Sequence, residues 1–534
     1  MPLLAVVADH LSSSSLARMP SWNDVEESSD NDNMGGNLMD MEYFETPDII
    51  LEPLFLGAPM EEVPKCSLHQ MMPRNCTYAR AMVTFTACRS KPELVLPARA
   101  TPREVRSLSD VDRQPILRSY TTVIEFFRCL VPGGAPAQPA SSLKAGLAEA
   151  LVHYYPIAGR LRELPVPHRN GEKLVVDCTA EGVVFVEAHA NVRLEELAMP
   201  LVPPYPCVDE LVCDVGDAGA IVGKPLLYLQ MTQLRCGGIV LALTMCHSVV
   251  DAFGLVQIFR CILDLARGEA QPAVLPSWER HLLTSSFSPE AAAMAEEAAP
   301  PPPLDEEEMV TRSFLFGPRE VAVLRSGVQA RLGRSSTVFE LITAAVWRCR
   351  AAALEHASHD RVSVWFLSNA RGSWKRDPPL PPGFYGNAPF IARAEAAAGE
   401  LQCGGGLARA VELVHEAKLR VTDEHVRSVL DLMARGEYRV DPDLDRTFLV
   451  SDITRCGDDS LNLGCWAERV GGGTPGLGPD HGFARSPPSL FMSYKDANGD
   501  VCVVVPMCLP ETVMARFASQ IAALTNVPIA RSSM

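Results

Sequence analysis

The stretch that decides the fold is Ile239-Val240-Leu241-Ala242-Leu243-Thr244-Met245-Cys246-His247-Ser248-Val249-Val250-Asp251-Ala252-Phe253-Gly254. Its first eight residues are an apolar run with the length of a buried strand, and His247 ends the run. From Gly254 the period becomes helical, and Gly268 marks the helix end. A strand, a short polar turn and a helix in succession predict an α/β lobe. Its titratable histidine stands at a strand end, where functional sites tend to lie.

The spacing of His247 and Asp251 is a weak signal by itself, because His356 and Asp360 repeat it. His356 lies in a polar segment and is interpreted as part of a solvated connection. At His247 the functional interpretation is a general base that deprotonates a hydroxyl or an amine. The alternative is a core histidine with Asp251 as a helix cap. The sequence has no Gly-x-Ser-x-Gly segment, which would place a nucleophilic serine. Direct attack by the deprotonated hydroxyl or amine is therefore favoured over a covalent intermediate on the enzyme.

Further elements of the first half follow from periodicity. Alternation predicts a first strand near Met82 to Ala87, and an apolar stripe predicts a helix from Ser142 to Tyr154 behind a serine cap. The segment Arg235 to Gly238 predicts a hairpin that ends in the strand before His247. The other predicted strands are Leu174 to Cys178, Val183 to Glu187 and Leu226 to Leu234.

The second half is separated from the first by residues 284–311, a linker rich in Ala, Glu and Pro. It restarts with a strand at Arg312 to Phe316, and Thr337 with Glu340 forms a capping box that opens a helix. We therefore expect two α/β lobes, residues 79–283 and 312–534, joined by a long crossover. The remaining predicted strands are Val362 to Leu367, Thr447 to Val450, Leu490 to Tyr494 and Val501 to Val505.

Bulk properties narrow the class of protein. The 534 residues carry a net charge of −17, which argues against nucleic acid and anionic membranes as partners. The 16 cysteines include no pair with the two-residue spacing of a zinc or redox motif, so we expect free thiols and no metal. No apolar run reaches the roughly 18 residues that span a bilayer. We expect a cytoplasmic protein with residues 1–78 as a disordered extension.

Several ordered motifs resemble the plant BAHD acyltransferases, whose HxxxDG motif is similar to the segment from His247 to Gly254. The chain also resembles the family at Tyr155-Pro156-Ile157-Ala158-Gly159-Arg160-Leu161, Phe384-Tyr385-Gly386-Asn387-Ala388 and Val450-Ser451-Asp452-Ile453-Thr454-Arg455. The segments Ser90 to Val95 and Leu108 to Asp112 are similar to the branch that holds benzyl alcohol benzoyltransferases and taxane acyltransferases.

The resemblance implies two chloramphenicol-acetyltransferase-like lobes with an active-site channel between them and His247 near its middle. It implies transfer of a benzoyl, other aromatic or short acyl group from the co-substrate acyl-CoA to an alcohol, by a monomer without a bound cofactor. In the family the aspartate of the motif is structural, so Asp251, Gly254 and the expected partner Arg371 would shape the turn. Residues expected in the CoA channel or at the substrate are Asn387, Ser451, Thr454, Gly464 and Trp466.

Two departures from the family pattern leave alternatives open. Where the family has its DFGWG segment, this chain reads Asn462-Leu463-Gly464-Cys465-Trp466. Only the glycine keeps its position, and the tryptophan comes one position later than in the family. This departure leaves a non-catalytic relative as one alternative. An N-acyltransferase is a second alternative, because nothing in the sequence excludes an amine acceptor. The second departure is the extension over residues 1–78, with Met82 as a candidate start.

Overall fold

The computed structural model describes residues 83–130, 139–165, 172–197, 200–217, 219–286, 309–329, 331–332, 334–372, 377–440, 443–457, 460–475, 487–496 and 498–526. All of them belong to one unit, Met72–Met534. The predictions for residues 1–78, for Met82 and for most of the 284–311 linker lie outside the described residues.

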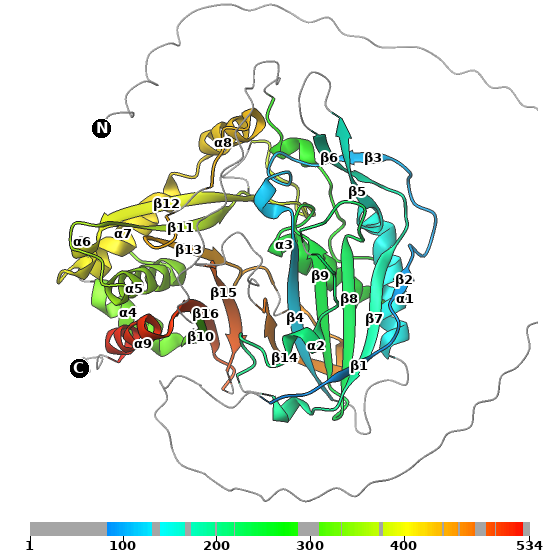
Figure 1. Cartoon of the computed structure of the whole chain (residues 1–534), viewed down its shortest axis with the longest axis horizontal. Helices are drawn as coiled ribbons and strands as arrows, with labels where there is room; N and C mark the ends of the chain where they lie inside the picture. The colour runs from blue at the N-terminus through cyan, green and yellow to red at the C-terminus, as the bar shows by residue number, and fades with distance from the viewer. Residues whose placement is uncertain are drawn as a thin grey trace, which may run out of the picture. The chain divides into compact units, whose positions relative to one another are not determined.

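Two large β-sheets organise the described chain (Figure 1). The first has the order β1-β7-β8-β9-β4-β14, with β2 also paired to β7. Its strands are β1 (Ala87–Arg89), β2 (Glu93–Val95), β4 (Tyr120–Cys129), β7 (Val183–Ala190), β8 (Leu227–Leu234), β9 (Ile239–Cys246) and β14 (Ala467–Gly473). A small neighbouring sheet has the order β3 (Val105–Ser107), β6 (Glu172–Asp177) and β5 (Arg160–Pro165).

The second large sheet has the order β10-β16-β15-β13-β11-β12. Its strands are β10 (Met309–Phe316), β11 (Arg361–Asn369), β12 (Pro389–Ala397), β13 (Thr447–Asp452), β15 (Ser489–Lys495) and β16 (Val501–Pro510). Strand β13 runs parallel to both of its neighbours, and the other pairs are antiparallel.

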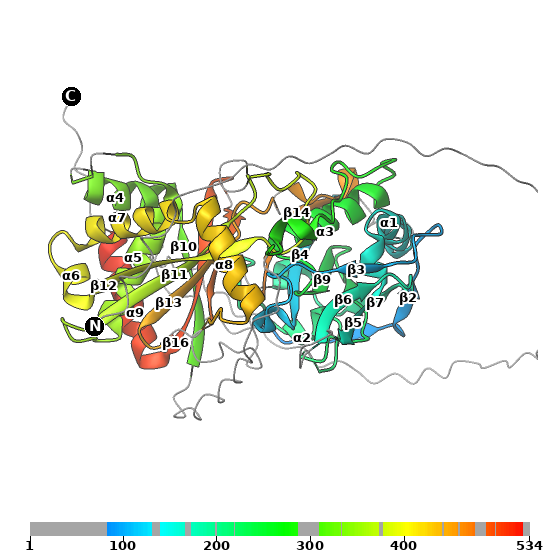
Figure 2. The same ribbon diagram turned by 90° about the horizontal axis from the view of Figure 1, so that it is seen from above.

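Helices accompany both sheets. Those of the first half are α1 (Pro139–His153), α2 (Val208–Leu211) and α3 (Ala252–Ala266). Those of the second half are α4 (Pro318–Gln329), α5 (Val338–Ala353), α6 (Ala398–Gln402), α7 (Gly406–Leu419), α8 (Asp423–Arg435) and α9 (Glu511–Thr525). Short 3-10 helices are η1 (Pro115–Leu117), η2 (Tyr155–Ala158), η3 (Leu194–Glu196), η4 (Arg280–Leu283) and η6 (Gly464–Trp466). Both views place α4, α5, α7 and α9 on the side of the second sheet that is farther from the first (Figures 1 and 2).

The first lobe forms around β9, whose eight residues are all buried. Strand β9 pairs with β8 through the predicted hairpin and with β4 on its other side. Helix α3 packs against α1, and together they bury the apolar stripe that the sequence predicts. Helix α1 begins at Pro139, so Ser142 lies within it and is not its cap. Proline suits the first turn, because its fixed φ is already helical.

The second lobe forms around α5, which the predicted capping box opens. The Thr337 hydroxyl accepts the backbone N–H of Glu340, and the Glu340 carboxylate accepts that of Thr337. Helix α5 packs against α7 and α9, and Trp347 at its centre is fully buried. This packing gives the second sheet its own apolar core.

One strand joins the two halves of the sequence. Strand β14 follows the second-half strand β13 along the chain, but it pairs antiparallel with β4 in the first sheet. Arg469 on β14 donates from Nε to Oε2 of Glu125 at 2.6 Å, and Glu125 is fully buried. The pairing fixes a segment of the second half against the first lobe.

No helix in the described ranges is long and apolar enough to cross a bilayer.

Candidate active site

A cavity of about 300 Å³ lies between residues of the two lobes. From the first lobe it is lined by residues around Ser119 and Tyr120 and by His247, Asp251 and Phe253. From the second lobe it is lined by β11, β12 and β13 and by Met433, Tyr438 and Val440. Most of these side chains are apolar or aromatic, and the lining includes no Lys or Arg among the described residues. The cavity therefore suits an uncharged substrate body.

His247 reaches this cavity because β9 ends immediately before it. Its backbone N–H donates to the Ser119 carbonyl at 2.8 Å, and its carbonyl accepts from Nδ2 of Asn387 at 2.7 Å. The ring nitrogen Nδ1 is buried and has no hydrogen-bond partner among the described residues. Burial lowers the pKa of His247, and its own backbone and the Asp251 carboxylate only partly oppose this. The imidazole is thus neutral near pH 7.

Asp251 is held by Arg371 through two hydrogen bonds. Nη1 of Arg371 donates to Oδ2 at 2.7 Å, and Nη2 donates to Oδ1 at 2.9 Å. The carboxylate also accepts the backbone N–H of Gly254 at 3.0 Å and that of Ala388 at 3.1 Å. Asp251 is therefore both the cap of α3 and an ion-pair partner. The predicted partnership with Arg371 agrees with this geometry.

Gly254 lies where another segment of the backbone approaches α3. A Cβ at this position would lie 2.1 Å from the carbonyl oxygen of Tyr385. Arg371 donates to the Gly386 carbonyl on the same segment at 2.7 Å. The segment from Phe384 to Ala388 is thus packed directly on the turn that carries His247.

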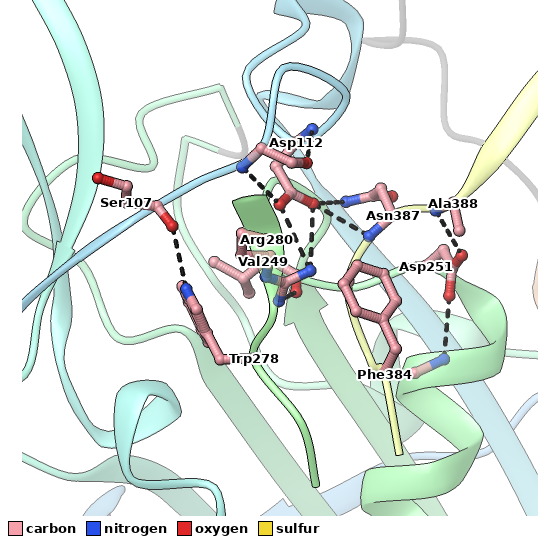
Figure 3. A network of polar contacts seen from close by, with 12 residues as sticks. Ser107, Asp112, Val249, Asp251, Trp278, Arg280, Phe384, Asn387 and Ala388 are labelled. Atoms are coloured by element: carbon pink, nitrogen blue, oxygen red, sulfur yellow. Dashed lines mark hydrogen bonds and ion pairs between the residues drawn. The ribbon is translucent and has the colours of Figure 1, made fainter. Parts of the chain in front are cut away.

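Asn387 is fully buried and does not line the cavity. Its expected place in the CoA channel or at the substrate stays a prediction. Its Nδ2 donates to Oδ1 of Asp112 at 2.8 Å (Figure 3). The same Nδ2 donates to the His247 carbonyl at 2.7 Å. The residue lies behind the histidine because the second-lobe segment that carries it folds under the turn. Asp112 and the buried Arg280 beside it were not predicted as site residues. Asp112 lies in a motif that signalled only family membership, and Arg280 has no sequence signal of its own.

Of the two residues predicted on the β13 motif, Ser451 lines the cavity and Thr454 does not. The Thr454 hydroxyl donates to Oδ1 of Asp452 at 2.6 Å, and the backbone N–H of Thr454 donates to the same oxygen at 3.0 Å. Asp452 itself lines the cavity. Thr454 thus holds in place a carboxylate that lines the cavity.

Gly464 and Trp466 lie in η6 and do not line the cavity. Gly464 is exposed, and its φ of +72° is in the region that favours glycine. The half-buried Trp466 packs against the apolar core of the first lobe, and its carbonyl accepts from the Leu130 N–H at 2.9 Å. Arg267, just after α3, donates to the Asn462 carbonyl at 2.8 Å. The altered segment is therefore anchored to the first lobe, outside the cavity wall.

Within the described part of the chain, no three His, Cys, Asp or Glu side chains could together hold a metal ion.

Comparison with known families decides the class. The model of the Transferase family matches residues 81–524, which is most of the chain. The chain belongs to this family, the BAHD acyl-CoA-dependent acyltransferases. The predicted resemblance and enzyme class are thereby confirmed.

Curated relatives of this BAHD chain are plant enzymes. Acyl transferase 1 of Oryza sativa subsp. japonica is 47% identical over 83% of the chain and 97% of the relative. Benzyl alcohol O-benzoyltransferase of Nicotiana tabacum is 41% identical over 83% of the chain and 95% of the relative. Spermidine hydroxycinnamoyltransferase 1 of the same rice subspecies is 42% identical over 72% of the chain and 88% of the relative.

A solved structure confirms the predicted fold class. The crystal structure of vinorine synthase superposes with a TM-score of 0.63 at 23% identity, covering 82% of the chain and 98% of that structure. The two-lobed α/β fold is therefore the one expected of the family.

Proposed function

We propose that the chain transfers an aromatic or short acyl group from acyl-CoA to a neutral alcohol, with His247 as the general base. The observation that carries the proposal is the position of His247. It lines the apolar cavity, while Arg371 occupies both oxygens of the only carboxylate in its motif. The ring nitrogen Nδ1 is buried, so we infer that Nε2 faces the substrate.

In the proposed reaction, neutral His247 accepts the proton of the acceptor hydroxyl at Nε2. The alcohol oxygen forms a bond to the thioester carbonyl carbon, and the resulting tetrahedral intermediate breaks its carbon–sulfur bond. The sulfur of coenzyme A leaves with the electron pair and takes the proton back from the imidazolium. The ester and free CoA are the products, and His247 returns to its neutral form.

The chemistry of the cavity supports the substrate class. Trp365, Phe366 and Tyr438 on the second lobe and Phe253 on the first contribute aromatic rings to the lining. Such a surface favours apolar or aromatic groups on the acyl chain, on the acceptor or on both. One relative of the chain is named for benzyl alcohol and a benzoyl group. Benzyl alcohol with benzoyl-CoA is therefore the first pair to test.

Acylation of an amine is the second candidate, because another relative is named for spermidine. A polyamine is cationic near pH 7 and would need carboxylates in the cavity to replace its lost hydration. The described lining offers Asp251 and Asp452, and Arg371 already neutralises Asp251. The cavity is therefore better suited to an alcohol than to a polyamine.

A non-catalytic relative is a weaker candidate, because the altered segment from Asn462 to Trp466 contributes no residue to the cavity. Its changes leave His247 and its supporting contacts intact.

Release of free thiol from benzoyl-CoA in the presence of benzyl alcohol tests the proposal, with spermidine as the amine arm. His247→Ala is expected to abolish this release while binding of CoA, measured by calorimetry, persists. His356→Ala is the matched control, because His356 has the same four-residue spacing to an aspartate and lies outside the cavity lining. Undiminished turnover by His247→Ala would refute the general-base assignment. Tight CoA binding by the wild-type chain without turnover on any acceptor would favour the non-catalytic alternative.

A further inference from the structure

A buried network of charges lies against the turn that follows β9 and contains Val249 (Figure 3). The carboxylate of Asp112 is fully buried, and Arg280 is only 2% exposed. Nη1 of Arg280 lies 3.3 Å from Oδ2 of Asp112, and Nη2 donates to the Val249 carbonyl at 2.8 Å. The arginine thus joins the carboxylate to the backbone of the turn.

Asn387 joins the same carboxylate to the same turn from the other lobe. Its backbone N–H and its Nδ2 both donate to Oδ1 of Asp112, at 3.0 and 2.8 Å. Nδ2 also donates to the His247 carbonyl at 2.7 Å. Both amide hydrogens therefore have an acceptor, and a flipped amide would place its oxygen against two oxygens. Chemistry permits one orientation of this side chain.

The two tethered carbonyls belong to His247 and Val249, on either side of Ser248. Asp112 holds both donors, so a single carboxylate fixes two points of the turn. Asp112 is itself held by Ser109, three residues earlier in the chain. Its Oδ2 accepts the Ser109 N–H at 3.1 Å, and its backbone N–H donates to the Ser109 hydroxyl at 3.1 Å. The tether is therefore rigid at both ends.

Aromatic rings surround the buried guanidinium of Arg280. Its guanidinium lies 4.4 Å from the ring centre of Trp278, 5.0 Å from that of Tyr385 and 5.2 Å from that of Phe384. A Cβ on Gly386 would lie 1.1 Å from Nη1 of Arg280. The glycine of this segment is thus needed to admit the guanidinium.

Stability alone is a weak reason for this arrangement. A buried ion pair is often no more stable than well-packed apolar residues of similar volume. Here Nε of Arg280 is also buried with no hydrogen-bond partner among the described residues, and such an atom is destabilising. A network that sacrifices stability beside a catalytic group is typical of a functional arrangement.

We propose that Asp112, Arg280 and Asn387 are positioning residues, which fix the peptide backbone at His247 and so aim its imidazole at the substrate. The inference rests on the proposed general base. Fixing the carbonyls of His247 and Val249 sets the direction of the bond from the His247 backbone to its side chain. A displacement of about 1 Å at a catalytic group can lower a rate about 100-fold.

Steady-state kinetics of Asn387→Ala test this role. We expect kcat to fall about tenfold or more, with KM for acyl-CoA and the Kd of CoA changed less than about threefold, because positioning acts on the transition state. The matched control is Gln230→Ala. Gln230 is also a fully buried amide that donates two hydrogen bonds, to the Glu210 carbonyl and the Thr232 hydroxyl, and it does not line the cavity. We expect Gln230→Ala to lose a similar amount of stability and to keep its kcat.

Asn387→Ser is measured in parallel, since it retains a hydroxyl donor and removes less polar surface. It provides the same comparison if the alanine variant does not fold. The inference is overturned if the folded Asn387 variants keep the kcat of Gln230→Ala, or if their loss lies in KM and CoA binding. If instead His247→Ala itself retains turnover, it is the proposed function that fails. The two failures are therefore separate results.

Discussion

Arg371 binds both carboxylate oxygens of Asp251, at 2.7 and 2.9 Å, across a sequence separation of 120 residues. The side chains of Arg371 and Asp251 are 17% and 9% exposed, so water has little access to this ion pair. Asp251 therefore links the first lobe to the second. The imidazole carries out the proposed proton transfer without a hydrogen bond to it.

Removing one partner of this pair is expected to leave a buried charge without compensation. Arg371→Ala should lower the free energy of unfolding by about 3 kcal/mol. Asp251→Asn should lower it by less, because the amide still accepts the Gly254 N–H. Denaturant titrations followed by fluorescence would measure both. A double variant whose loss equals the sum of the single losses would contradict the direct coupling of the two residues.

The pH dependence of activity follows from the burial of His247. Burial lowers the pKa of this imidazole from its ordinary value of 6.5, so the reactive neutral form persists to lower pH. The acid limb of kcat/KM should therefore have its midpoint below 6.5, with activity lost as the pH falls through it. Rates measured with benzoyl-CoA and benzyl alcohol between about pH 4.5 and 8 would locate the midpoint to within about one pH unit. A midpoint above the ordinary histidine value would be inconsistent with a desolvated base.

Two helical glycines give a matched pair of substitutions. Gly254→Ala should destabilise the chain by about 2 kcal/mol, because its Cβ would overlap the Tyr385 carbonyl. Gly327→Ala should stabilise it by about 0.5 to 1 kcal/mol, since this exposed α4 position has open space and alanine favours the helix. Thermal melting of the two variants should shift in opposite directions. Equal shifts in melting temperature would show that the close approach of the Tyr385 carbonyl does not make Gly254→Ala destabilising.

The altered segment from Asn462 to Trp466 should matter for stability more than for turnover. Trp466→Ala removes a half-buried ring from the first-lobe core and should lower the free energy of unfolding by about 2 kcal/mol. Since Trp466 does not line the cavity, kcat of the folded variant should stay within about twofold of the wild type. A large loss of kcat with little change in melting temperature would assign this indole to the reaction instead.

Glu340 at the start of α5 should make stability depend on pH. Burial raises its pKa, but hydrogen bonds from Lys418, His415, the Thr337 N–H and Arg334 outweigh burial and lower the pKa to about 2. The ionised carboxylate therefore stabilises the fold at any pH above 4.5, the ordinary pKa of a glutamate. This stabilisation is lost as the pH falls from 4.5 toward 2. Glu340→Gln should lower the free energy of unfolding by about 2 to 3 kcal/mol near neutral pH. The difference from wild type should shrink below pH 4.5. A difference independent of pH would show that ionisation of this carboxylate is not what stabilises α5.

Local patterns predicted the elements whose own residues determine them. Strand β9 has the predicted bounds, and α5 begins after its predicted cap, Thr337. Helix α3 begins at Ala252, two residues before Gly254, from which its helical period is predicted. In α1 the serines suggested a cap, but Pro139 starts the helix earlier because proline fits the first turn. Strand β12, at Pro389–Ala397, was not predicted, since its alanines carry little strand preference.

The residues that support the site could not be predicted in the same way. Asp112 and Asn387 are 275 residues apart, and their contact depends on the assembly of both lobes. A sequence pattern reports the period of one segment and carries no information on which distant segment packs behind it. For this reason the sequence indicates neither the contact of Asn387 with Asp112 nor the position of Arg280.

The pairing of β14 with β4 also has a consequence for biosynthesis. Strand β4 precedes its outer neighbour by more than 300 residues, as the 344-residue separation of Glu125 and Arg469 shows. At about 5 to 20 residues per second, the ribosome would need roughly 20 to 70 s to deliver β14 after β4 has emerged. During that time the nascent first lobe presents an unpaired, largely apolar strand edge, a typical starting point for aggregation. The first lobe expressed without the segment Ala467–Gly473 should therefore need a chaperone to remain in solution.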